Sequence, residues 1–242
     1  MNMKLNTLTR LPQLSHMSIP VVKKGDEMTV RQDPEKKNAH ILAERIAELK
    51  SEISVIDPYL LAERTGTIFT ETPEGSRFHF QFWWRQVSMD YPGLILFDSA
   101  SGKAPGAAQQ TLVLYYYRTA DGTEIDNRWI SFSELPEGRF YTQAFHSYTG
   151  QEIAKVYGHD QELFEKAAVA VGGERINFAD SASAFTILPR VKLASALWLG
   201  DEDFPASAQI LFNAAAHHYL PTDACAIAGS MLTGLLIEAK KG

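Results

Sequence analysis

The chain has 242 residues, a formal net charge of −6 and a single cysteine. This length is sufficient for a domain with a substantial buried core. The acidic balance disfavours nucleic acids and anionic membranes as partners, because both are bound by concentrated basic surfaces. One cysteine excludes an intramolecular disulfide and any cysteine-rich zinc or iron–sulfur site within this chain.

Residues 1–32 show no hydrophobic period, and we interpret them as an N-terminal arm ahead of a single domain over residues 33–242. The arm has no continuous apolar segment of the kind found in signal peptides. No stretch of eighteen apolar residues occurs, so no transmembrane helix is expected. These features predict a cytoplasmic protein.

Two helices are predicted next, each from a local start signal. Asp33 and Pro34 suit the first positions of a helix that runs to about residue 53. The aspartate side chain can accept hydrogen bonds from the free backbone N–H groups of the first turn, and the missing N–H of proline costs nothing at the first helical position. The same start recurs at residues 57–58, and Gly66 is suited to end this shorter helix in a left-handed conformation.

From Thr67 the hydrophobic period changes to two, which is typical of a strand with one buried face. In the stretch RFHFQFWWRQ the inward set is Phe78, Phe80, Phe82 and Trp84, and the outward set is Arg77, His79, Gln81, Trp83 and Arg85. The aligned cations of the outward set, with an indole among them, form a candidate site for an acidic or planar ligand. A solvated sheet face is the alternative interpretation.

Further strands are predicted from short runs of β-branched and aromatic residues, at 94–97, 111–118, 128–132 and within 134–145. A turn at 119–122 would join two of them into a hairpin over 111–132. Helical patterning resumes at Gly150, breaks at residues 158–160 and ends at Val171. Extended segments at 175–179, 184–199 and 208–212 and a terminal helix over 221–240 complete the chain. The fold class predicted is α+β, an antiparallel aromatic-rich sheet with flanking helices.

Two segments of the chain resemble each other. DYPGLILFDSA at 90–100 and DFPASAQILFNAA at 203–215 share Asp-aromatic-Pro, a spacer and Ile-Leu-Phe. An internal duplication would place a cleft between two related halves, where ligands often bind. The alternative is a coincidence between two strand entries, because no fixed repeat period supports the match.

The motifs of several common enzyme classes do not occur in the sequence. SGKAPG lacks the preceding glycine and the following Ser or Thr of a phosphate-binding loop. No GxGxxG, HExxH or GxSxG motif is found. Cys225 falls on the inner face of the terminal helix with Leu232 and Leu236, which predicts a buried, inert thiol.

One family shares several longer patterns with this chain: WISFSELPEGRFYTQAF, the GG at 172–173, FTILPRV, and LWLGDEDFPASAQILF followed by HHYLPTDA. In these the chain resembles the prokaryotic family called domain of unknown function 3786, over roughly residues 35–237 and most specifically over 129–223. The resemblance implies a family found mainly in anaerobes, some of whose members carry a cysteine-rich segment like that of corrinoid iron–sulfur proteins. This chain, with one cysteine, has no such segment. The family supplies no catalytic residues to transfer.

Other candidate site residues are histidines and acids. His217 and His218 are consecutive, and neighbouring side chains on a helix or strand point in different directions, so both can bind one metal ion only from an irregular backbone. One of them is a candidate axial ligand to haem or cobalt. The alternative is a histidine buried in the core. The acidic run 201–203 is either a cation chelate or a solvated loop. His146, placed between a predicted strand and a helix with Ser147 and Thr149 beside it, belongs either to an anion site or to a helix cap.

These observations lead to three functional hypotheses, and neither a cofactor nor a metal is assigned. The first is a non-catalytic cytoplasmic ligand- or cofactor-binding or accessory protein, linked by the resemblance to anaerobic redox or corrinoid metabolism, with a small molecule or a redox protein as partner. The second is an enzyme acting on a small anionic substrate, with His146 or His79 as proton-transfer group. The third is a structural subunit. The oligomeric state is not predicted.

Overall fold

A computed structural model describes residues 34–126 and 128–240. The arm assigned to residues 1–32 and the helix cap assigned to Asp33 lie outside the described residues. The helices are α1 (Pro34–Ile53), α2 (Pro58–Thr65), α3 (Ala107–Thr119), α4 (Thr142–Tyr148), α5 (Gly150–Tyr157), α6 (Gln161–Ala170) and α7 (Thr222–Ala239). Short 3-10 turns are η2 (Phe132–Glu134), η3 (Gly138–Phe140) and η4 (Ala216–His218).

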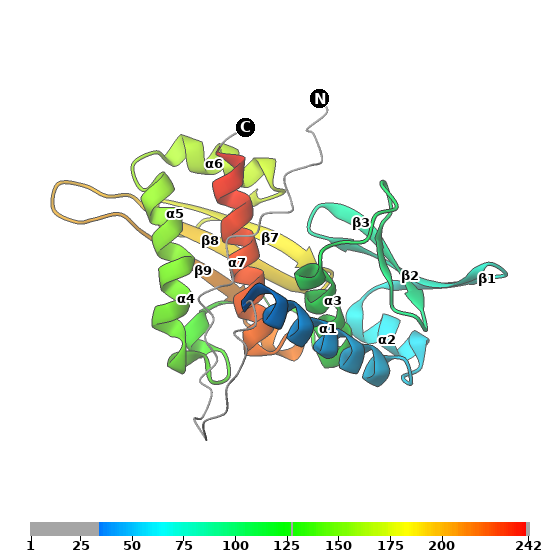
Figure 1. Cartoon of the computed structure of the whole chain (residues 1–242). Coiled ribbons are helices and arrows are strands. Elements are labelled where there is room, and N and C mark those ends of the chain that lie inside the picture. The colour runs from blue at the N-terminus through cyan, green and yellow to red at the C-terminus, as the bar shows by residue number, and fades with distance from the viewer. Residues whose placement is uncertain (1–33, 127, 241–242) are drawn as a thin grey trace, which may run out of the picture.

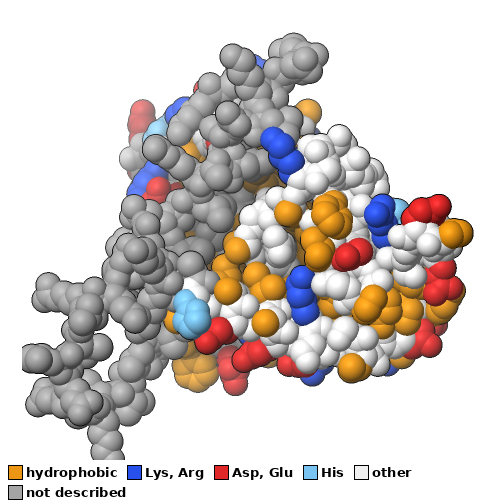
Figure 2. Space-filling view, turned by 45° about the vertical axis from the view of Figure 1, so that its right-hand side comes forward, with side chains coloured by type: hydrophobic (Ala, Val, Ile, Leu, Met, Phe, Trp, Pro, Cys, Tyr) orange, Lys and Arg blue, Asp and Glu red, His pale blue; other side chains and the backbone are white. Residues whose placement is uncertain are grey.

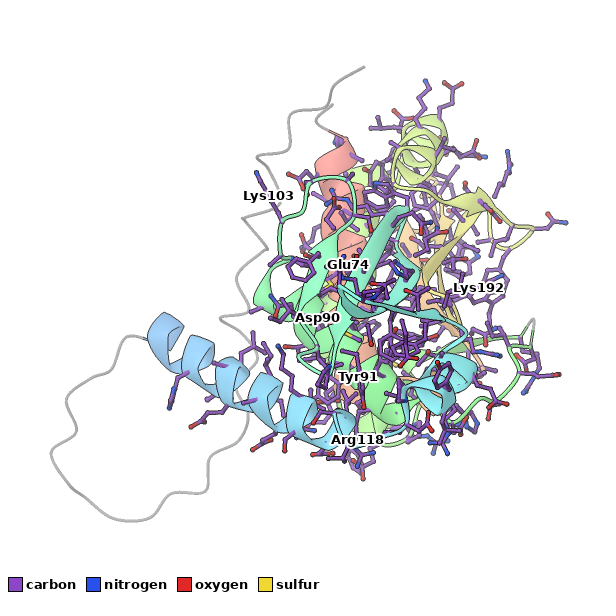
Figure 3. The ribbon with its side chains drawn as sticks, turned by 90° about the vertical axis from the view of Figure 1, so that its right-hand side faces the viewer. Glu74, Asp90, Tyr91, Lys103, Arg118 and Lys192 are labelled. Carbon is purple, nitrogen blue, oxygen red and sulfur yellow. The ribbon has the colours of Figure 1, made fainter. Side chains whose placement is uncertain are left out.

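The strands form two antiparallel sheets, which confirms the α+β class but replaces one predicted sheet by two. The first has the order β1-β2-β3-β4, with β1 (Ile68–Thr72), β2 (Gly75–Phe82), β3 (Arg85–Tyr91) and β4 (Leu96–Asp98). The second has the order β5-β9-β8-β7-β6, with β5 (Trp129–Ser131), β6 (Glu174–Arg175), β7 (Ser181–Leu188), β8 (Val191–Trp198) and β9 (Ser207–Asn213). In Figure 3 the two sheets, marked by Asp90 on β3 and Lys192 on β8, lie next to each other.

The helices cover the second sheet on one side. Figure 1 shows α5 and α7 in front of β7, β8 and β9, with α6 above these strands, while α1 crosses α3 beside the first sheet. Buried side chains of both sheets and of the central helix α3, among them Phe78, Leu112 and Phe185, belong to one hydrophobic cluster. On the face drawn in Figure 2, basic, acidic and hydrophobic side chains of the described residues are interspersed.

Helix α7 is, by length and composition, apolar enough to cross a membrane. Half of this span is buried inside the fold, and Cys225, Leu232 and Leu236 are fully enclosed. These are the three residues that the helical spacing predicted to face inward, so that prediction is confirmed. The burial is that of a core helix.

The helix signals near the start of the described chain are confirmed. Asp57 accepts hydrogen bonds from the backbone N–H groups of Tyr59 (2.8 Å) and Leu60 (3.4 Å), and Pro58 occupies the first helical position. Gly66 ends the helix with a φ of 65°, the left-handed conformation that glycine adopts without strain. Asp160 caps α6 in the same way, through the N–H of Leu163.

The strand predicted at 111–118, and with it the hairpin over 111–132, is wrong. The segment belongs to helix α3. Its run of β-branched and aromatic residues resembles a strand, but Leu112, Val113, Leu114, Tyr116 and Tyr117 are all buried. A helix buried on most sides has no polar stripe, so hydrophobic period does not distinguish it from an inner strand.

The strand predicted within 134–145 is also wrong. This segment contains the turn η3 and the first residues of helix α4, so His146 lies inside a helix and not at the end of a strand. Thr149 then breaks the helical path with a φ of −121° and a ψ of −86°, and α5 begins directly after it.

The alternation predicted over residues 77–85 holds only to Phe82. Phe78, Phe80 and Phe82 are buried as expected. There β2 ends in a tight turn in which Trp83 has a φ of 54°. The turn reverses the predicted roles of the tryptophans, because Trp83 is 5% exposed and Trp84 is 42% exposed.

The two similar segments have different roles in the fold. In the first, Leu96 pairs with Met89 on edge strand β4 and faces the core. In the second, Leu211 pairs with Ala194 on strand β9, which lies between β5 and β8, and its neighbours Ile210 and Phe212 face the core instead. The equivalent leucines therefore differ in their surroundings, because Leu96 belongs to the main hydrophobic cluster and Leu211 to a separate small one. This difference favours a coincidence between the starts of two strands over a duplication.

Candidate functional site

A groove of about 420 Å³ lies where α5 crosses the beginning of β9. It is lined by His146, Gln151, Ala154, Lys155, His159, Ala206, Ser207 and Ala208. This volume falls within the range of small-molecule sites. The sequence singled out His146 among these residues, and the structure places it in a groove with two further basic side chains.

Two glycines bring helix α5 against strand β9. A Cβ atom on Gly150, at the first position of α5, would lie 2.1 Å from the carbonyl oxygen of Ala208. A Cβ on Gly158, just after the helix, would lie 2.3 Å from the Cβ of Ala206. Side chains at these two positions would push the helix off the strand, so the glycines determine where the groove forms.

The polar side chains reach the groove from different elements. Gln151, Ala154 and Lys155 are three and four residues apart, so they share one face of α5. His146 comes from α4 and His159 from the turn after α5, so the imidazoles border opposite ends of that helix. The hydroxyl-bearing Ser207 is exposed at the start of β9.

Lys155 is the one Lys or Arg among the residues that line the groove, and no Asp or Glu lines it. Lys155 forms an exposed ion pair with Glu152, Nζ to Oε1 at 2.5 Å, of the weak kind found between neighbouring residues on helix surfaces. His146 and His159 occur in none of the ion pairs found among residues 34–126 and 128–240. Ionic donors of this type bind carboxylate or phosphate groups most strongly.

The adjacent histidines lie at the other end of β9, in η4. The Nδ1 atom of His218 is 2.6 Å from Oδ2 of Asp121 and 3.2 Å from the hydroxyl of Thr123. The Nδ1 atom of His217 is 3.0 Å from the carbonyl oxygen of Ala214. The ring centroids are 4.2 Å apart. Both histidines are at least partly exposed, so neither is the enclosed core histidine that was one alternative.

The carboxyl group of Asp121 is held ionised. Burial by itself would raise its pKa, but hydrogen bonds from His218 and Thr123 outweigh this and lower the pKa to about 2. The carboxylate therefore accepts from the imidazole and from the backbone N–H of Thr123, at 2.9 Å, throughout the physiological range.

The predicted cationic row on β2 is only partly present. Arg77 and His79 share the outer face of the first sheet. In the antiparallel register Arg77 lies opposite Asp90 of β3, and the Nε2 atom of His79 is 3.0 Å from the hydroxyl of Thr70. Arg85 does not belong to the row. It pairs with Phe82 across the turn and so lies on the opposite face.

Arg85 has its own partners. Its Nη1 atom is 4.0 Å from Oδ2 of Asp98, and its guanidinium lies 5.7 Å from the ring centre of Trp84. Gln81 and both tryptophans border a separate cavity of about 80 Å³ with Gly172 and Glu174. The structure thus divides the predicted row among three surroundings.

The acidic run 201–203 has a local structural role. Asp201 accepts hydrogen bonds from the backbone N–H groups of Asp203 (2.9 Å) and Phe204 (2.7 Å), which closes the turn of the β8–β9 connection. Figure 1 shows this connection projecting from the second sheet. Cys225 is fully buried, and burial together with the charge of Asp223 raises the pKa of its thiol well above the usual value.

Sequence reasoning missed Lys155, His159 and Asp121. Lys155 has the pattern of an ordinary solvated helix residue, and the GHD segment indicates only a helix break. Asp121 lies in a segment, TADG, that indicates only a turn. Lys155 and His159 line the groove together with residues at the start of β9, and Asp121 contacts His218, so the groove and the carboxylate–imidazole contact join segments distant in the chain.

The comparison with protein families gives a match to a domain of unknown function (DUF3786) over residues 57–234, which is most of the chain. The chain belongs to this family. The groove described above lies entirely within the matched residues. No curated protein and no solved structure matches the chain.

Proposed function

We propose that this protein is a cytoplasmic binding or accessory protein that holds a small anionic ligand in the groove between α5 and β9 without converting it. The observation that carries the proposal is the convergence of His146, Lys155 and His159 on one groove in a chain with a net charge of −6. A basic island in an acidic protein attracts anions locally while the rest of the surface repels them.

The groove offers a consistent set of donors for such a ligand. The Lys155 ammonium has three N–H donors, and a protonated imidazole has two, suited to carboxylate or phosphate oxygens. Gln151 and Ser207 add neutral hydrogen-bonding groups at the same surface. The alanines supply small apolar walls, as is usual in ligand sites.

We propose the metabolic setting of this binding from the family resemblance alone. The resemblance to a family of anaerobes supports a place in redox or corrinoid metabolism, with a small molecule or a redox protein as partner. No residue of the groove bears on that setting, so the anion proposal does not depend on it.

The enzyme hypothesis uses the same groove. Two imidazoles at one site supply the acid and the base that proton transfer needs. A structural subunit, in contrast, needs no ligand. Turnover therefore distinguishes the first two hypotheses, and the presence of a ligand distinguishes both from the third.

The first experiment is native mass spectrometry and absorption spectroscopy of protein purified without oxygen, which detects a co-purifying ligand. The second is calorimetric titration with phosphate, sulfate and small di- and tricarboxylates. Nuclear magnetic resonance of the ligand that binds then shows whether it is unchanged, as expected, or converted, as the enzyme hypothesis requires.

A matched pair of lysines tests the site. Lys155 and Lys166 are both exposed and both paired with a glutamate one helical turn earlier. Removing a charge-assisted hydrogen bond costs about 1.5–3 kcal/mol, so Lys155→Met should weaken anion binding by about 10- to 100-fold. Lys166→Met, on α6, should leave it unchanged. Equal effects of the two substitutions, or no anion binding at all, contradict the proposal.

A further inference from the structure

His217 and His218 are arranged for a chemistry that the anion groove does not use. The N–H at Nδ1 of His217 donates to the carbonyl oxygen of Ala214, which can only accept. The N–H at Nδ1 of His218 donates to the Asp121 carboxylate, which also can only accept. In the neutral form of each ring, Nε2 therefore carries the free electron pair.

This hydrogen-bond pattern is the one that histidine ligands of metal ions adopt. Such a ligand usually donates its second ring N–H to a carboxylate or a backbone carbonyl, which fixes the tautomer and increases the basicity of the coordinating nitrogen. Here one ring has each type of acceptor.

The two rings are also close together and accessible. Their centroids are 4.2 Å apart with an interplanar angle of 43°, and both side chains are at least partly exposed. Consecutive residues on a regular helix or strand point apart, so the irregular turn η4 makes this proximity possible.

The support beneath the pair is built from separate elements. Tyr219, which follows η4, donates its hydroxyl to the carbonyl oxygen of Thr123, and the N–H of Thr123 donates to Oδ1 of Asp121 at 2.9 Å. Tyr219 is fully buried and its ring lies 5.8 Å from that of Tyr116 on α3. The carboxylate that orients His218 is thus itself held in place.

From these contacts we propose that His217 and His218 bind one divalent transition-metal ion through their Nε2 atoms, with water in the other positions and Asp121 as a positioning residue. Imidazole nitrogen suits zinc, copper and nickel. No third His, Cys, Asp or Glu completes a cluster with this pair within residues 34–126 and 128–240, so exchangeable binding is expected rather than a permanent structural ion. The pair and the anion groove lie at opposite ends of β9, and the two proposals are independent.

The test uses the full chain without a histidine tag. Calorimetric titration with Zn²⁺ should show one ion per chain, and His217→Ala and His218→Ala should each abolish it. Asp121→Asn keeps an oxygen acceptor for the imidazole N–H but removes the charge, so it should weaken binding by about tenfold. His79→Ala, on the outer face of the first sheet, is the control and should bind Zn²⁺ like the natural protein.

Copper gives a second measurement that does not depend on affinity. The electron paramagnetic resonance spectrum of the Cu²⁺ complex should show hyperfine coupling to two imidazole nitrogens. Coupling to one nitrogen, absence of Zn²⁺ binding at millimolar concentration, or binding that survives both histidine substitutions overturns the proposal. Circular dichroism of each variant confirms that lost binding is not lost folding.

Discussion

The backbone N–H of Trp83 donates a hydrogen bond to the carbonyl oxygen of Ile187 at 2.9 Å. This bond joins the tip of the β2–β3 hairpin in the first sheet to strand β7 in the second. Trp83 holds a left-handed φ of 54° at that point, a conformation that a bulky residue rarely adopts. Its burial and this hydrogen bond together maintain the turn.

The two neighbouring tryptophans are expected to differ sharply in their contribution to stability. Trp83→Ala removes a buried indole and should lower the free energy of unfolding by about 3–5 kcal/mol. Trp84→Ala affects a side chain that is 42% exposed and should cost well under half of that. Urea denaturation of both variants measures the difference. Equal losses would mean that the turn does not separate the two side chains as described.

Strand β2 provides a second comparison. Phe80 is buried and His79 faces outward with a hydrogen bond to Thr70. Phe80→Ala should cost about 3–5 kcal/mol of unfolding free energy through lost burial and the cavity left behind. His79→Ala should leave the melting temperature nearly unchanged. The reverse result would show an inverted strand register.

Helix α5 should tolerate no side chain at its first position. In Gly150→Ala the new methyl group meets the carbonyl oxygen of Ala208, so α5 must move away from β9. Overpacking of this kind costs about 1–3 kcal/mol, and anion binding should weaken as the groove changes shape. Gly106→Ala is the control, because no atom lies within 4 Å of its added Cβ. Thermal denaturation and calorimetric titration of both variants test this.

The contribution of Asp121 to stability should depend on pH. Its pKa in the folded protein, about 2, is below the usual value of 3.8. Its stabilisation is therefore complete above pH 3.8 and is lost as the pH falls from there toward 2. The stability difference between the natural protein and Asp121→Asn, measured by urea denaturation, should therefore stay level from neutral pH to 3.8 and shrink as the pH is lowered further to about 3. A difference that stays constant would contradict the assigned contacts.

The thiol of Cys225 should react only when the protein opens. It is fully buried, and its raised pKa leaves almost no thiolate at neutral pH. A thiol reagent should label the native protein far more slowly than the protein in concentrated urea. Labelling of the native protein at the rate of the unfolded chain would place the thiol at the surface.

The local signals in the sequence determined helix ends, the burial of β2 and the inner face of α7. Asp57 and Gly66 contact backbone groups within a few residues of themselves, so their effect can be predicted from the local sequence alone. The alternation of Phe78, Phe80 and Phe82 is likewise a property of a single strand that has one buried face and one solvent-exposed face. The family resemblance rested on longer patterns, and the family match over residues 57–234 bears it out.

Tertiary structure alone decided the nature of α3 and the surroundings of the candidate sites. An apolar segment buried on most sides satisfies helix and strand equally well, and the elements packed around α3 made the choice. His146 was identified from its neighbours in sequence, but in the wrong element and without its partners. Lys155 and His159 line the same groove as His146 because Gly150 and Gly158 let α5 rest on β9, and Asp121 contacts His218 only when a distant loop folds back. Contacts between segments so far apart in the chain arise from packing, which no local pattern records.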